Sequence, residues 1–328
     1  MGKNKVERTC IQKIAEEAGV STATVSRVFN RHPYVSKGIC DKVIAAARKY
    51  GYAPTITTTR KHFGVLVGTF SSLNANAYVG QMLPAISRQF FELGCNVQLI
   101  SHENFPYLLH NSYSGVIVFS ASDTEIFRKL QIPCLVINSP ADGVCNIATD
   151  HFESLRIAVE YLLKLNHRRI AFLHSLPEKW GSSERLRGYH SALDDAGVSQ
   201  ENRLTEIFTG TSDIPVCIRK LMKRKPTALI VEGEPYGLTA DHALKQLGIR
   251  IPDDLSLITF ENEVISAFAT PPHTTICQDF EELGTHAAKM LVEYVLQSPE
   301  KRILPKLRFF HNHLIERASC APLSGPRN

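Results

Sequence analysis

The segment that most constrains the fold is residues 15–30, AEEAGVSTATVSRVFN. It continues an apolar helical stripe that stops at Gly19, a residue that readily takes the positive φ that ends a helix. Ser21 is a good N-cap for a second helix, from which Val25 and Val28 would face inward. Two short helices joined by a tight turn form a helix-turn-helix, whose second helix fits the major groove of DNA.

The second helix of this pair is expected to present small polar side chains and one cation on its outer face. Thr22 and Ala23 stand at its N-terminal end, the part of a recognition helix that contacts base edges. Arg27, further along the same face, can reach a guanine edge or a phosphate. The sequence therefore predicts a face that reads DNA.

A helix is predicted on either side of the turn. Thr9 and Gln12 have capping-box spacing, which predicts that the first helix begins at Thr9. Ser36 can cap a third helix. The residues expected to face the core from that helix are Ile39, Val43, Ala47 and Tyr50. Taken alone, this pattern also suits any small three-helix bundle with a solvated polar face.

The distribution of charge favours nucleic-acid binding over an ordinary bundle. Residues 1–62 carry 12 lysines and arginines against 4 acidic residues, a formal charge of +8. The whole chain is +5, so the remaining residues sum to −3. A basic head on a mildly acidic body is the electrostatic footprint of a nucleic-acid-binding protein.

Beyond residue 62, strand-like and helix-like segments alternate. Strands are predicted at 63–70, 95–101, 114–120, 133–139, 168–175, 204–210, 227–233, 254–262 and 307–315. Helices are predicted at 78–93, 123–130, 151–165, 183–196, 212–225, 236–247 and 280–297. Continuous apolar runs such as 65–67 and 229–231 are typical of strands covered on both faces. This alternation predicts a doubly wound α/β fold, in which ligands bind beyond the carboxyl ends of the strands.

Composition narrows the class of protein further. A chain of 328 residues is long enough for the head and two compact lobes. No run of 18 apolar residues predicts a membrane span, and no N-terminal apolar run predicts a signal peptide. We therefore expect a cytoplasmic protein rather than a secreted solute-binding protein. The eight cysteines are scattered without a CxxC pair, which predicts reduced, mostly buried thiols and no metal site.

The sequence does not favour an enzyme. It contains no GxGxxG, GxxxxGK[ST] or GxSxG motif. Histidine and serine are adjacent at 174–175 and at 101–102, but neighbouring strand residues point to opposite faces. We expect neither catalysis nor a cofactor.

Residues 14–52 resemble the DNA-binding head of the lactose-repressor (LacI/GalR) family, through the motifs AGVSTATVSRVFN, PYVS and YGYAP. The resemblance continues through the body at 167–171, 185–189, 248–256, 271–275 and 317–319. It implies a small all-α helix-turn-helix head and a two-lobed α/β body of the type I periplasmic-binding-protein-like fold. In that fold, three crossovers join the lobes and an effector cleft lies between them.

The same resemblance implies a division of the chain. The head would be 1–54, the linker 55–62, the effector-binding and dimerisation domain 63–322, and the tail 323–328. Lobe one would comprise 63–146 and 277–304, and lobe two 147–275 and 306–322. The crossovers would fall near residue 146, residues 275–278 and residues 304–306.

Roles for head residues follow from the resemblance. Thr22, Ala23 and Arg27 match its base-reading positions, and Ser21, Thr24 and Ser26 match phosphate or near-groove contacts. Asn30, at the end of the same segment, completes the expected DNA-binding set, and Arg60 and Lys61 are expected to contact phosphate.

The resemblance also implies an effector site. Its expected residues are Arg185, Asn138, Glu261, Asn74, Asn76 and Tyr78. Trp180, the only tryptophan, is placed in a loop after a strand and is expected to stack on a ligand ring. A structural salt bridge is the alternative for Arg185, and a cap on the lobe surface is the alternative for Trp180. Glu261-Asn262 and Gly233-Glu234 depart from the acidic and amide pairs usual in the family, so no particular sugar is predicted.

The linker departs from the family as well. After Pro54 the family usually forms a hinge helix, whose leucine wedges into the minor groove. Here the linker is short and reads TITTTRKH at 55–62, rich in β-branched residues that are poor helix formers. We expect a weakened or absent hinge helix.

Together these features predict a homodimeric transcription regulator, by family default a repressor, that binds double-stranded operator DNA and no membrane. A small-molecule effector, a sugar or sugar derivative, is expected to modulate operator affinity. The alternative is a DNA-binding regulator with a ligand-silent or protein-partner-regulated body.

Overall fold

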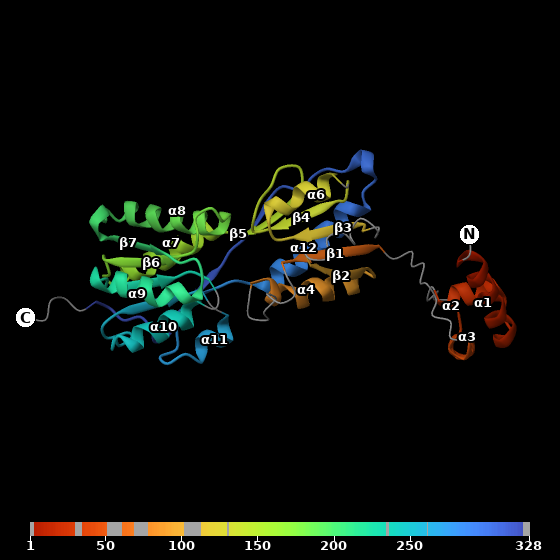
Figure 1. Ribbon diagram of the computed structural model, residues 1–328. Helices are drawn as coiled ribbons and strands as arrows, with labels where there is room; N and C mark the ends of the chain where they lie inside the picture. Colours follow the sequence, from red (N-terminus) through yellow and green to blue (C-terminus); the bar gives the residue numbers. More distant parts are fainter. Residues whose placement is uncertain are drawn as a thin grey trace, which may run out of the picture. The chain divides into compact units, whose positions relative to one another are not determined.

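The computed structural model describes residues 3–29, 35–50, 61–68, 78–101, 113–129, 131–233, 236–260 and 262–323. They belong to two compact units, residues 1–61 and residues 62–328. Figure 1 shows the helices and strands of both. None of the described helices is long and apolar enough to cross a bilayer.

The first unit is a three-helix head made of α1 (Lys3–Ala18), α2 (Thr22–Phe29) and α3 (Lys37–Lys49). The turn between α1 and α2 contains Gly19 with φ of 66°, as its sequence position predicts. The buried core consists of Ile14, Ala15, Ala18, Val25, Val28, Val43, Ala46 and Ala47. The helix-turn-helix prediction is confirmed.

Two details of the head differ from the sequence-based expectation. α1 begins at Lys3 rather than at Thr9, because the preceding residues continue the helix and the capping-box spacing lies inside it. Tyr50 is 39% exposed instead of buried. Its hydroxyl donates a hydrogen bond to Glu17 Oε2 at 3.0 Å, so it joins α1 to the end of α3 from the surface.

The first lobe of the second unit is built on a sheet of six described parallel strands in the order β11-β5-β4-β3-β1-β2. The strands are β1 (His62–Val67), β2 (Asn96–Ser101), β3 (Gly115–Val118), β4 (Cys134–Ile137), β5 (Cys145–Thr149) and β11 (Arg308–Phe310). Helices α4 (Tyr78–Glu92) and α12 (Phe280–Leu296) cover one face, and α6 (Thr124–Lys129) packs on the other.

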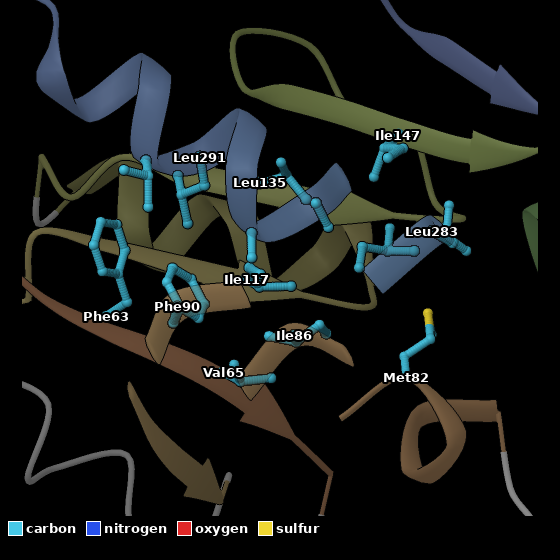
Figure 2. Close-up of a cluster of buried hydrophobic side chains, with 14 of the residues drawn as sticks. Phe63, Val65, Met82, Ile86, Phe90, Ile117, Leu135, Ile147, Leu283 and Leu291 are labelled. Atoms are coloured by element: carbon cyan, nitrogen blue, oxygen red, sulfur yellow. The ribbon is translucent and has the colours of Figure 1, made fainter. Parts of the chain in front are cut away.

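The core of this lobe lies between the sheet and the α4–α12 pair (Figure 2). Its members include Phe63, Val65, Ile117, Leu135 and Ile147 from strands, Met82, Ile86 and Phe90 from α4, and Leu283 and Leu291 from α12. The rings of Phe63 and Phe90 stack with centroids 4.7 Å apart. Burial on both faces explains why the central strands β3 and β4 carry no polar side chain.

The second lobe has a sheet of six described strands in the order β12-β10-β9-β8-β6-β7, parallel except for β12. The strands are β6 (Ile170–His174), β7 (Arg203–Ile207), β8 (Ala228–Val231), β9 (Ser256–Thr259), β10 (Thr274–Cys277) and β12 (His313–Ile315). Helices α7 (His151–Lys164) and α8 (Trp180–Asp195) cover one face, and α9 (Ile214–Lys223) and α10 (Tyr236–Gln246) the other (Figure 1). The short α11 (Glu263–Ala267) follows β9.

The doubly wound prediction is confirmed, but two of the three crossovers lie elsewhere than predicted. β5 pairs with β4 through Thr149, so the first crossover follows Thr149 rather than residue 146. The segment predicted as one strand at 307–315 is two strands in different sheets, and the third crossover lies at 311–312 rather than 304–306. The second follows Cys277, within the predicted range.

Candidate functional site

The outer face of α2 is available for contact with a partner. Thr22, Ala23, Ser26 and Arg27 are exposed, whereas Val25 is buried. This division is the one expected for a helix, because residues three or four positions apart lie on the same face. The four exposed residues therefore form one surface on one side of the helix, with two hydroxyls, the Ala23 methyl group and one guanidinium.

Ser21 and Thr24 fix the start of that helix. Ser21 Oγ accepts a hydrogen bond from the backbone N–H of Thr24 at 3.1 Å and lies 2.9 Å from Thr24 Oγ1. Ser21 is thus an N-cap, as its position predicts. Lys61 is half-buried, and Asn30 and Arg60 lie outside the described residues.

A cavity of about 490 Å³ lies between the two lobes of the body. Its walls include Phe119 after β3, Asn138 after β4, Ser175 after β6, Glu232 after β8 and Gln278 after β10. All five follow the carboxyl ends of parallel strands, the edge at which open α/β sheets bind ligands. The cavity is therefore where the fold is expected to hold a small molecule.

Four of the predicted effector residues line this cavity: Tyr78, Asn138, Trp180 and Arg185. Tyr78 begins α4 and Asn138 follows β4 in the first lobe, whereas Trp180 and Arg185 both lie on α8 in the second. The other three, Asn74, Asn76 and Glu261, lie outside the described residues, as does Glu234.

Arg185, on α8, is the most informative of these side chains. Its guanidinium carbon lies 5.2 Å from the centre of the Phe260 ring, and Nη1 lies 3.3 Å from Glu232 Oε1. Only 11% of the side chain is exposed, and Nε is buried without a hydrogen-bond partner among the described residues. Arg185 thus makes the salt bridge that the sequence left as the alternative, and still has one free donor.

Glu232 is the main residue that sequence reasoning missed. Its Oε1 accepts a hydrogen bond from Ser175 Oγ at 2.7 Å, and its Oε2 accepts one from Ser182 Oγ at 3.1 Å. With 4% of its side chain exposed, it is a buried carboxylate with a partner on each oxygen. From the sequence, Gly233 and Glu234 were considered instead, although the first residue after a buried strand is the position more closely associated with ligand binding in this kind of sheet.

His151 is the second residue that sequence reasoning missed. Its ring lies 5.6 Å from the Trp180 ring, and its Nδ1 is buried without a hydrogen-bond partner among the described residues. Gly181 makes room for it, since a Cβ there would lie 3.0 Å from His151 Cδ2. Burial, and then the charge of Arg185, lowers the pKa of His151 well below its usual range, so the imidazole is neutral.

Aromatic rings form the wall contributed by the first lobe. Tyr78 meets Phe119 edge to face at 5.8 Å and Phe280 at 6.0 Å. Burial raises the pKa of Tyr78, which keeps its hydroxyl protonated. Flat apolar surface beside a few fixed polar atoms is typical of small-molecule sites.

Asn138 lines the cavity, but both polar atoms of its side-chain amide already form hydrogen bonds within the protein. Its Oδ1 accepts a hydrogen bond from the Thr149 backbone N–H at 2.6 Å, and its Nδ2 donates to Thr149 Oγ1 at 3.3 Å. Its φ is 54°, a conformation that asparagine tolerates better than most residues. Asn138 therefore joins the ends of β4 and β5 at the cavity wall.

Comparisons with known proteins agree with both parts of the chain. Residues 10–55 match the model of bacterial regulatory proteins of the lacI family, and residues 159–320 match the periplasmic-binding-protein-like domain. The "HTH-type transcriptional repressor PurR" of Vibrio atlanticus (strain LGP32) is 26% identical over 341 residues, covering 96% of this chain and 99% of the relative.

Solved structures show the same fold. A lac repressor dimer bound to operator and the anti-inducer ONPF has a TM-score of 0.77 at 24% identity, covering 94% of this chain and 98% of that one. A complex of the transcriptional regulator CelR with cellobiose has a TM-score of 0.70 at 24% identity, covering 94% and 99%. With the exposed α2 face and the cavity between two lobes, these matches place the chain in the lacI family of bacterial regulatory proteins, as a DNA-binding transcriptional regulator.

Proposed function

We propose that the chain is a homodimeric repressor in which each head reads one half of a near-palindromic operator. Thr22 and Ala23 would contact base edges from the N-terminal turn of α2, and Arg27 a guanine edge or phosphate. The exposure of these side chains supports the assignment. The dimer is supported by the lac repressor structure, which is a dimer on its operator.

The cavity between the lobes is the proposed effector site, for a sugar or sugar derivative. The observation that carries this proposal is a set of three buried polar atoms on the cavity wall, the Tyr78 hydroxyl, His151 Nδ1 and Arg185 Nε, which have no hydrogen-bond partner among the described residues. A buried donor or acceptor without a partner costs about 1–3 kcal/mol, so a fold that keeps three such atoms in one cavity favours a ligand that satisfies them. The aromatic wall suits the apolar face of a sugar ring, and the CelR complex holds cellobiose.

The proposal is tested with the full chain. An operator is first selected from a random oligonucleotide pool, and fluorescence anisotropy then measures its affinity with and without each member of a sugar and nucleoside panel. Thermal unfolding measures binding directly, because a ligand that prefers the folded state raises the Tm. We expect at least one sugar to raise the Tm and to change operator affinity.

Arg185→Ala should abolish both the rise in Tm and the change in operator affinity. Each is measured relative to the same variant without ligand. Arg187→Ala is the matched control, because Arg187 lies on the same helix but is 63% exposed and pairs with Glu184. An unchanged response in Arg185→Ala would refute the cavity as the effector site. A body that responds to no member of the panel would favour the ligand-silent or partner-regulated alternative.

A further inference from the structure

Resting on the proposed effector site, we propose that Glu232 makes this cavity selective for electrically neutral ligands and excludes their phosphorylated or carboxylated counterparts. The proposal makes Glu232 a specificity-determining residue. It rests on the geometry of one buried ion pair and on the charges of the cavity walls.

The first step is that Glu232 is held in place. It directly follows β8, and a serine hydroxyl bonds each of its oxygens, from Ser175 at 2.7 Å and from Ser182 at 3.1 Å. Ser182 belongs to α8, the helix that also carries Arg185. A carboxylate fixed from two elements does not turn away when a ligand enters, because doing so would break two buried hydrogen bonds.

The second step is that Glu232 neutralises the buried cation of the cavity. Its Oε1 lies 3.3 Å from Arg185 Nη1. The other charged side chains on the described walls are Glu178 and Lys179, which are exposed and opposite in sign. His151 adds no charge, since its pKa is lowered by burial and by Arg185. The described walls therefore offer an anion no uncompensated positive charge.

An anionic ligand would be disfavoured wherever it binds near this ion pair. To pair with Arg185, a phosphate or carboxylate would have to displace Glu232, which would leave a buried carboxylate without its cation. To bind beside the pair, it would approach that carboxylate in a region of low dielectric, where like charges repel strongly. A neutral ligand meets neither obstacle. Arg185 Nε is free to donate to an uncharged hydroxyl or carbonyl oxygen.

The decisive experiment uses inorganic phosphate as the probe and the full chain as the protein. Glu232→Gln removes the charge but preserves the packing. The amide oxygen can still accept from Ser175. The amide NH₂ can donate to Ser182 Oγ, because the single Ser182 hydroxyl proton, which lies between Glu232 Oε2 and the Ser175 carbonyl, can then donate to that carbonyl alone, at 3.0 Å. The released Arg185 should then bind phosphate. At about 20 mM phosphate, with ionic strength held constant by chloride, we expect the Tm of Glu232→Gln to rise by about 2 °C more than that of wild type.

Two controls separate this effect from a general change of charge. Glu201→Gln removes the same charge from an exposed position of the same lobe outside the cavity, and its response to phosphate should match wild type. Adding Arg185→Met to Glu232→Gln should abolish the gain. An equal phosphate response in wild type and Glu232→Gln, or a gain that survives loss of Arg185, would overturn the proposal.

A second measurement needs no variant at Glu232. Wild type is titrated with neutral and anionic partners: ribose and glucose with their phosphate esters, and galactose with galacturonate. For any pair that binds, we expect the neutral member to bind at least about tenfold more tightly, because like charges repel by more in a partly buried site than the energy to which a tenfold ratio corresponds. An anion that binds as tightly as its neutral partner would refute charge selection while leaving the effector site intact. The opposite combination is that Glu232→Gln gains phosphate binding although no sugar stabilises the protein. This result would refute sugars as the proposed effector class and would leave charge selection by Glu232 supported.

Discussion

The packing of α7 on α8 sets the geometry of the cavity, and Gly188→Ala tests it. A Cβ built on Gly188 would lie 2.1 Å from the backbone carbonyl oxygen of Phe152 and 3.2 Å from Leu155 Cβ. Real Cβ atoms essentially never lie within 3.0 Å of such an atom, so the two helices would have to separate by about 1 Å. Because the obstructing atom belongs to the backbone, no side-chain rotation relieves the clash.

The magnitude follows from two opposing effects. Overpacking costs about 1–3 kcal/mol, and a backbone clash belongs at the upper end. Alanine recovers about 1 kcal/mol of helix propensity relative to glycine. The net loss is about 2 kcal/mol, which lowers the Tm of the body by roughly 4–8 °C. The response to effector should weaken as well, because Arg185 stands one turn before Gly188.

Thermal unfolding followed by circular dichroism measures this change. Gly210→Ala is the matched control in the same lobe, since nothing lies within 4 Å of a Cβ there and the backbone is extended. We expect that control to unfold within about 1 °C of wild type. If Gly188→Ala also unfolds at the wild-type temperature, the close approach of α7 and α8 does not hold and the reasoning fails.

Three further predictions concern the head and the pH response. Arg27→Ala should weaken specific operator binding by about 1–3 kcal/mol if the side chain reads a base, whereas a uniform loss on all sequences would identify a phosphate contact. Ser21→Ala removes the hydrogen bond to the Thr24 amide and should cost α2 about 1 kcal/mol of protection in hydrogen exchange, and unchanged protection would contradict the cap. Burial lowers the pKa of His151, so the unfolded chain binds more protons and stability should fall as the pH drops through about 6.5. Between about pH 8 and pH 5.5 the Tm should fall less in His151→Asn than in wild type or in the exposed control His242→Asn, and equal slopes would refute this account.

The sequence predicted the order of elements well because most strands of the body are buried on both faces. Runs such as 228–231 have no polar interruption, so their position is evident from composition alone. β5 and β10 were not predicted, since asparagine and threonine break their apolar pattern. Their existence depends on pairing with distant strands, which periodicity within one segment does not report.

The site was partly predictable for a different reason. Arg185, Asn138 and Tyr78 were expected from family resemblance and Trp180 from its position after a strand, and all four line the cavity. Glu232 could not be chosen that way, because its role depends on two serines and an arginine that only the folded chain brings together.

The arrangement of the crossovers shows which ligand contacts can affect the lobes. His151 directly follows the first crossover and Gln278 the second, and both line the cavity. Thr149 Oγ1 donates to Gln278 Oε1 at 3.5 Å, and the Asp150 backbone N–H donates to the Phe310 carbonyl, beside the third crossover, at 2.8 Å. The three connections therefore meet at one edge of the cavity.

A ligand shifts an equilibrium between two lobe arrangements only by its difference in affinity for them. Contacts with Arg185 and Glu232 alone belong to a single lobe, so they can supply affinity in either arrangement without favouring one. Contacts that also include Tyr78 on α4 join the two lobes across the cavity. It follows that a small compound held only by the second-lobe wall should bind without changing operator affinity, whereas one long enough to reach Tyr78 should change it.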